Sequence, residues 1–248
     1  YVFFTSFFWW QVPNTTAWVF ERNSLLFFMV IAQANGIVIS AVTVFQRERA
    51  LLQRERHKKL YGVASYFLAK TVSDMTANVL LPVAYGLVVY WTAGFRSTAT
   101  AFFKFVLAYY WTLSTAQSMG LWLSIVLPSL PLALALAPPL TLFFMIMGGF
   151  YIRFENMPTW IVWSSWLSFA RYGYSALIIN EYQGRDIPCD DNVSADLLLL
   201  GTNGGGVESC PLPGNAVIAS RGSEGVADNY WFNFGMVCLV QVVCGGAA

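Results

Sequence analysis

The stretch RERALLQRERHKK, residues 47–59, lies between two long apolar segments and predicts the orientation of the whole chain. It holds six of the 14 lysines and arginines, namely Arg47, Arg49, Arg54, Arg56, Lys58 and Lys59. Short basic loops between membrane spans face the cytoplasm. Because Ala50, Leu51 and Leu52 interrupt the charges, we expect a helical extension below the membrane.

The composition argues against a water-soluble domain. Of the 248 residues, 57% are hydrophobic and 11% are charged, against about 25% charged in typical soluble domains. The mean hydropathy is +0.55. A water-soluble protein of this size would need more charged residues on its surface. The chain is therefore predicted to be an integral membrane protein. With no basic patch in a soluble domain, nucleic acid is not an expected partner.

Uncharged segments predict the spans. Residues 24–45 are long enough for one spanning helix. The segment 61–94 follows, with Lys70 and Asp74 four residues apart on one helical face, which predicts an intramembrane ion pair. Residues 105–152 carry no charge and suit two spans. We place these spans near 101–127 and 132–152, because Pro128 and Pro131 lie between them.

Three regions follow from this pattern. Residues 1–152 hold spans one to five, with a cytoplasmic loop at 46–60 and a first span that is truncated at the start of the chain. Residues 153–228 are predicted to be external: aromatic re-entrant or interfacial helices, then a loop rich in Gly, Pro, Asn and Asp. The aromatic residues expected at headgroup depth are Trp160, Trp163, Trp166, Tyr172 and Tyr174. Residues 229–248 form the last span.

Independent signals agree with this topology. Asn14 and Asn192 each begin a glycosylation sequon, and both fall on the predicted outer side. Cys189 and Cys210 lie in the outer loop, where a disulfide between them is permitted. Cys238 and Cys244 lie in the last span and are expected to act as small apolar residues.

No catalytic or metal-binding motif is present in the sequence. His57 has no cysteine or acidic neighbour at metal-ligand spacing, so no metal site is predicted. The sequence also lacks a GxxxxGK[ST] phosphate-binding loop. The basic stretch therefore has two physical interpretations: a collar that binds lipid headgroups, or a docking element for a cytoplasmic motor.

A resemblance bears on this choice. The stretch FQRERALLQRERHKKLYGVASYFLAKTVSDM, residues 45–75, is similar to the membrane domain of ABC transporters of subfamily G, the White and multidrug-exporter type. The residues that match the family pattern are Glu48, Glu55, Tyr61, 65–68, Lys70 and Asp74. A second similar stretch is GGFYIRFENMPTWIVWSSWLSFARYGYSALIINEYQG, residues 148–184. Its matching residues are Gly149, Pro158, Trp160, 171–174, Ala176, Leu177, Asn180, Glu181 and Gly184.

The resemblance implies an all-α membrane bundle of six spans (the ABC-2, or type V exporter, fold) with re-entrant external helices. It implies ATP-driven export of hydrophobic or amphipathic substrates, such as a lipid, sterol, xenobiotic or pigment precursor, by alternating access. The working unit would be a homodimer or heterodimer of half-transporters in the plasma membrane or an organelle membrane. ATP and Mg would bind a nucleotide-binding domain outside these residues, and membrane lipids would surround the spans.

The same resemblance assigns roles to residues. The coupling helix would include Glu48, Arg49, Arg54, Glu55 and Arg56. The substrate cavity would be lined by Gln33, Asn35, Gly36, Leu142 and Met145, although small and amide residues also serve helix packing. The family's aromatic clamp falls near Gly36, so a different drug selectivity is expected. Phe150 and Tyr151 would form an apolar plug between inner and outer cavities.

Two rival classes remain open. An accessory or structural membrane subunit could retain this fold without ATP-coupled transport. A channel or secondary carrier is disfavoured, because no span carries a row of charges.

Overall fold

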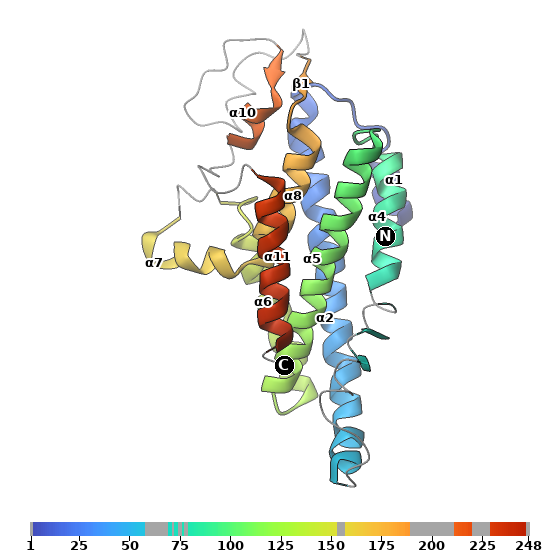
Figure 1. Ribbon diagram of the computed structural model, residues 1–248, viewed down its shortest axis with the longest axis vertical. Coiled ribbons are helices and arrows are strands. Elements are labelled where there is room, and N and C mark those ends of the chain that lie inside the picture. The colour runs from blue at the N-terminus through green and yellow to red at the C-terminus, as the bar shows by residue number, and fades with distance from the viewer. Residues whose placement is uncertain are drawn as a thin grey trace.

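The computed structural model describes residues 2–57, 69–70, 72–73, 76, 79–152, 157–188, 211–219 and 229–246. Its long helices run side by side along one axis of the molecule (Figure 1). In chain order, the N-terminal elements are α1 (Val2–Phe8) and the 3-10 helix η1 (Thr16–Trp18). The described part is predominantly helical, as predicted.

Helix α2 (Val19–His57) is the longest element and runs through the expected basic loop without a break. Its 39 residues give a length of about 58 Å at 1.5 Å per residue. The prediction of a helical extension is therefore confirmed as far as His57. The helix projects below the rest of the bundle, where its lower end carries the arginines (Figure 1).

Helix α5 (Ala99–Val126) covers nearly the whole range expected for a span near 101–127 and forms the centre of the bundle. It packs against α2, α8 (Phe169–Tyr182) and α11 (Tyr230–Gly246). Its buried residues include hydroxyl and amide side chains such as Thr112, Ser114 and Gln117. Thr112 bonds within α5, where its hydroxyl donates to the Ala108 carbonyl at 2.7 Å, and Ser114 bonds across helices, where its Oγ accepts from Gln241 Nε2 at 2.7 Å.

Helix α6 (Leu130–Ile146) begins at the predicted proline break. Pro131 lies in its first turn, where a missing N–H costs nothing. The helix ends at Ile146, earlier than the expected residue 152, because Gly149 has a φ of +82°. This left-handed conformation favours glycine and stops the helix.

Helix α4 (Leu80–Thr92) lies in the second half of the segment 61–94 and packs beside α1. It ends in a turn at Gly94, whose φ is +71°. Much of the segment before α4, including Asp74, lies outside the described residues.

The expected external region divides into two parts. The short α7 (Thr159–Val162) and the 3-10 helix η4 (Trp163–Leu167) extend sideways from the bundle (Figure 1). Helix α8 instead runs within it, and Tyr172 and Tyr174 are 1% and 3% exposed. These two tyrosines are therefore buried within the bundle, and their expected position at headgroup depth stays a prediction. The Tyr174 ring meets the rings of Phe27 and Phe150 edge-on, and the Tyr172 hydroxyl donates to the Trp166 carbonyl at 3.0 Å.

The upper end of the molecule carries the small elements. Strands β1 (Asp186–Ile187) and β2 (Leu212–Pro213) pair antiparallel, and α10 (Gly214–Ala219) follows directly. Helix α11 then returns along the bundle and accounts for the last predicted span.

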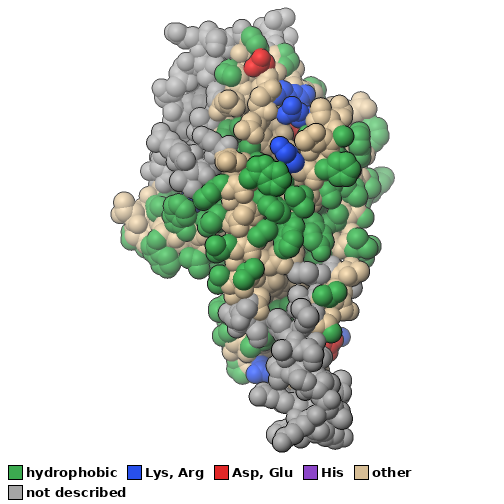
Figure 2. All heavy atoms as spheres, in the orientation of Figure 1, with side chains coloured by type: hydrophobic (Ala, Val, Ile, Leu, Met, Phe, Trp, Pro, Cys, Tyr) green, Lys and Arg blue, Asp and Glu red, His purple; other side chains and the backbone are tan. Residues whose placement is uncertain are grey.

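One described helix, Thr16–Arg49, has both the length and the hydropathy of a membrane span. Three further helices are apolar but shorter, at Leu80–Thr92, Leu130–Ile146 and Tyr230–Gly245. Figure 2 shows hydrophobic side chains over the middle of the molecule and most charged side chains toward its two ends. This arrangement suits a bilayer around the middle, while the number of spans stays a prediction.

Candidate functional site

The residues expected to line a substrate cavity lie on two helices that pack together, α2 and α6. On α2, Gln33 and Asn35 are partly exposed and Gly36 is exposed. On α6, Leu142 is 54% exposed and Met145 is partly exposed. The structure thus brings all five residues to neighbouring helices; we call their shared surface the α2–α6 face. Their role in substrate binding stays a prediction.

One polar contact fixes the two helices at this face. The Thr141 hydroxyl donates a hydrogen bond to Asn35 Oδ1 over 3.1 Å. A Cβ placed on Gly36 would meet no atom within 4 Å, so space is open beside it. Asn35 therefore contributes to helix packing, whereas Gly36 borders free volume.

The expected plug residues follow directly after the Gly148–Gly149 turn that ends α6. Phe150 stacks on Phe27 of α2, with ring centroids 4.4 Å apart and an interplanar angle of 15°. Tyr174 of α8 meets both rings edge-on, at 5.3 Å from Phe27 and 5.9 Å from Phe150. Tyr151 is 60% exposed. Phe150 is therefore held by aromatic residues from two other helices.

Sequence reasoning missed Phe27 and Tyr174 as partners of Phe150. Phe27 lies within an uncharged run in which every apolar residue fits a membrane span equally well. No periodicity distinguishes it from its neighbours, so only the three-dimensional packing reveals the contact.

The expected coupling residues all lie on the lower part of α2, residues 46–57, which we call the basic end. Arg47 and Arg54 are exposed there. The Glu48 carboxylate forms an ion pair with Lys70, whose Nζ lies 2.7 Å from Glu48 Oε2. Lys70 was expected to pair with Asp74, but Asp74 lies outside the described residues. The side chains of the coupling residues Glu55 and Arg56 also lie outside the described part of the chain. The Lys70–Asp74 pair therefore stays a prediction.

A cluster of charges that the sequence did not reveal lies at the upper end of the molecule. Arg22 at the start of α2 donates to Glu181 of α8 at 2.6 Å, and these side chains are only 2% and 3% exposed. Arg185 Nη1 lies 3.0 Å from the same carboxylate, and the backbone N–H of Arg96 donates to it at 3.1 Å. We call these four residues the Glu181 cluster.

The Glu181 cluster joins segments that are far apart in the chain. The Arg22 guanidinium also donates to the carbonyls of Val12 and Gly94. Burial raises the pKa of the Glu181 carboxyl, and the Arg22 guanidinium opposes that rise. The cluster therefore ties α2, α8 and the turn after α4 together at one end of the bundle.

Of the expected modification sites on the outer side, Asn14 is described and lies beside the Glu181 cluster. The side-chain amide of Asn14 lies between the Arg22 and Arg185 guanidinium groups of this cluster. The second sequon residue Asn192, and both Cys189 and Cys210, lie outside the described residues. Glycosylation and the disulfide therefore stay predictions.

Comparison with known proteins identifies the class of this chain. Residues 1–182 match the family model of the ABC-2 type transporter. The chain therefore belongs to the ABC-2 type transporter family, and it is a membrane protein.

The curated relatives narrow the class to G-type transporters. The chain is 32% identical over 178 residues to ABC transporter G family member 14 of Arabidopsis thaliana, covering 72% of this chain and 27% of that protein. It is 30% identical over 224 residues to ABC transporter G family member 1 of Dictyostelium discoideum, covering 88% and 27%. It is 28% identical over 222 residues to the ATP-binding protein/permease wht-1 of Caenorhabditis elegans, covering 88% and 32%. The chain thus spans about a quarter to a third of the length of these relatives.

Proposed function

We propose that this chain is the transmembrane domain of an ATP-driven exporter of hydrophobic or amphipathic substrates. One observation carries the proposal: α2 runs unbroken from the Glu181 cluster, past the α2–α6 face, to the basic end. A stiff helix of this kind can carry a movement made below the membrane to a site within it. Family membership supports a transporter role for the arrangement.

The mechanism we infer uses no bond chemistry in this chain. ATP and Mg would bind a nucleotide-binding domain that docks on the basic end, where Arg47 and Arg54 are exposed. Closure of that domain would move α2 and narrow the α2–α6 face. Substrate would leave because it binds the narrowed state less tightly than the open state. Binding and conformational change can influence each other only through such a difference in affinity between the two states. The aromatic stack around Phe150 would have to open for passage.

The proposed partner is a second half-transporter, either an identical chain or a relative. The α2–α6 face is partly exposed in the single chain, so a second copy could close it into a cavity. If the second copy is an identical chain, two-fold symmetry would make each chain contribute the same residues to the cavity. We further propose that this cavity is where alternating access occurs, in the plasma membrane or an organelle membrane.

The remaining site assignments belong to the same proposal. Glu48, Arg49, Arg54, Glu55 and Arg56 would couple ATP use to the bundle. At the opposite end, Asn14 and Asn192 would be glycosylated, and Cys189 would pair with Cys210, all on the outer side.

The function is tested by ATP-dependent uptake into inside-out vesicles that contain the full-length protein. The probes are fluorescent sterol and phospholipid analogues with an uncharged acyl or ring system. We expect ATP-dependent accumulation of at least one probe class. Uptake that does not depend on ATP for any probe would favour the accessory-subunit alternative instead.

The cavity assignment predicts a selective effect of Gly36→Phe. Its ring would enter the open space beside Gly36 and obstruct the α2–α6 face, so ATP-dependent uptake should fall severalfold while the protein still folds. Gly235→Phe on α11 is the matched control, since a Cβ there also meets nothing within 4 Å. Equal uptake by the two variants would contradict the cavity assignment.

A further inference from the structure

Two side chains of the basic end of α2 hold the lower end of α5. Gln46 Nε2 donates to the carbonyls of Ser124 and Leu127, at 2.7 Å and 2.9 Å. Arg49 Nη1 donates to the same Leu127 carbonyl at 2.8 Å. Positions 46 and 49 are three residues apart and so share one face of the helix.

The sequence of the α5–α6 turn explains why these carbonyls need donors from elsewhere. In a continuing helix, a carbonyl accepts from the N–H four residues later. For Ser124 and Leu127 those residues are Pro128 and Pro131, and proline has no N–H. The two prolines therefore leave the carbonyls of Ser124 and Leu127 without these backbone donors. Gln46 and Arg49 donate to them instead.

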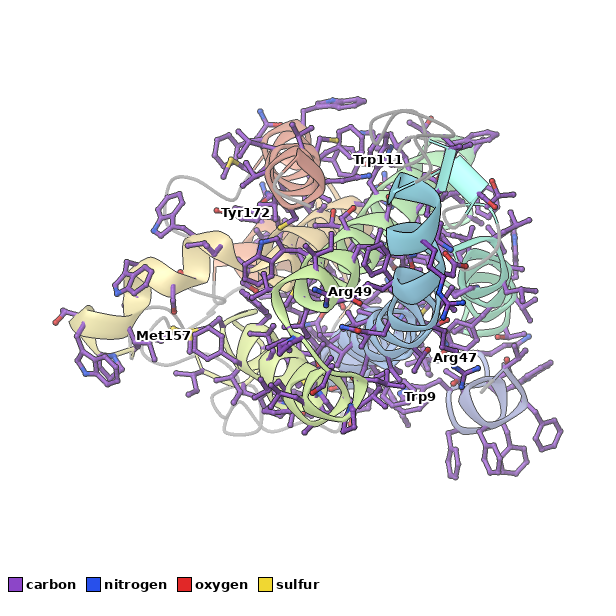
Figure 3. The ribbon with its side chains drawn as sticks, turned by 90° about the horizontal axis from the view of Figure 1, so that it is seen from below. Trp9, Arg47, Arg49, Trp111, Met157 and Tyr172 are labelled. Carbon is purple, nitrogen blue, oxygen red and sulfur yellow. The ribbon has the colours of Figure 1, made fainter. Side chains whose placement is uncertain are left out.

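Charge strengthens this contact. The C-terminal end of a helix carries partial negative charge, which a cation in the last turn stabilises. A hydrogen bond from a guanidinium is also stronger than one between neutral groups. Figure 3, viewed from below, shows Arg49 between α2 and α5, whereas Arg47 points away from α5.

We propose that Gln46 and Arg49 are positioning residues that make the basic end of α2 and the α5–α6 turn move as one body. This inference rests on the proposed function. A movement received at the basic end would then enter the bundle by two routes, along α2 itself and through the turn into α6. The second route leads to the Gly148–Gly149 turn and Phe150, at the far end of α6. Arg49 thus acts inside the bundle rather than on the nucleotide-binding domain.

The test measures one distance in two states of the full-length protein. Spin labels are attached at Arg54→Cys and Ser129→Cys, two exposed positions on either side of the contact. Double electron–electron resonance then gives their separation without nucleotide and with ADP trapped by vanadate. The parent protein without these two cysteines reports the background from native thiols.

We expect the same mean distance in both states. With Arg49→Ala added, the distance in the vanadate-trapped state should shift and its distribution broaden, because the two elements are no longer held together. Arg47→Ala is the matched control, with the same charge removed two residues away, and it should behave like the parent. Arg49→Lys, which keeps a cationic donor, should restore the single distance.

Several outcomes would overturn the inference. One is a distance that changes between the two states while Arg49 is present. Another is an Arg49→Ala variant that is indistinguishable from Arg47→Ala in both states. Failure of vanadate to trap any nucleotide in the parent protein, which keeps Arg54, would contradict the proposed function itself, and the inference with it.

Discussion

Replacing Glu181 with glutamine is expected to lower the free energy of unfolding by about 3–5 kcal/mol, the usual cost of removing one partner of a buried ion pair. The substitution preserves the shape of the side chain and removes its charge. Arg22, which is 2% exposed, would then keep its positive charge with only neutral acceptors, such as the Val12 and Gly94 carbonyl oxygens. The amide N–H₂ would moreover face the guanidinium groups as a second donor.

The measurement is the thermal unfolding midpoint of the purified protein in detergent, followed by tryptophan fluorescence. Asp186→Asn is the matched control, since it removes an exposed carboxylate five residues further along at the same end. We expect that control to change stability by no more than about 0.5 kcal/mol, as is usual for surface positions. Similar midpoints for Glu181→Gln and Asp186→Asn would show that the Glu181 cluster does not stabilise the bundle.

Gly120→Leu is expected to separate α2 from α5 and to abolish assembly of the bundle. A Cβ at position 120 would lie 2.9 Å from the Ala41 Cβ and 3.0 Å from the Val38 carbonyl oxygen. Two of its three nearest atoms belong to the backbone of α2, so they cannot move aside as a flexible side chain could. Overpacking commonly costs about 1–3 kcal/mol, and the three further carbons of leucine should bring the cost to the upper end or beyond.

The expected result is a large loss of monodisperse protein in size-exclusion chromatography of a fluorescent fusion. Gly235→Leu on α11 is the control, because no atom lies within 4 Å of its added Cβ. That variant should elute as the unaltered protein does. Normal elution of Gly120→Leu would contradict the close α2–α5 contact that organises the bundle.

The long elements of the fold could be predicted because their signals are local. Uncharged runs indicated α2, α5 and α11, and the two prolines indicated the α5–α6 break. The positions of helix ends depend on single residues such as Gly149, whose positive φ stops α6 before the expected boundary. A hydrophobic run does not reveal which glycine adopts that conformation.

Helix α8 shows why the rest of the fold could not be predicted. Its mixture of aromatic and polar residues is typical of an interfacial helix, yet it is buried. Its polar residues are compatible with burial because their partners come from elsewhere in the chain. Asn180 Nδ2 donates to the Ala101 carbonyl at 2.8 Å, and Glu181 binds an arginine 159 residues away. Such pairings have no signature in a single sequence.

The candidate site also has a part that could be predicted from the sequence and a part that could not. The resemblance to known transporters placed the expected cavity and plug residues on α2 and on the end of α6, and the structure brings those elements together. The side chains that hold them, Phe27, Thr141 and Gln46, carry no distinguishing sequence signal. For Gln46 a signal existed in principle, since Pro128 and Pro131 leave carbonyls on α5 without N–H donors.

The most direct test of the account is the side of the membrane on which the basic end of α2 lies. Cells and inside-out vesicles that contain the full-length Arg54→Cys variant are treated with a membrane-impermeant maleimide, and labelling of the parent protein is subtracted. We expect labelling in inside-out vesicles and none on intact cells, because the basic end must meet a cytoplasmic nucleotide-binding domain. Labelling of position 54 from outside intact cells would contradict the topology, the coupling role and the exporter function together.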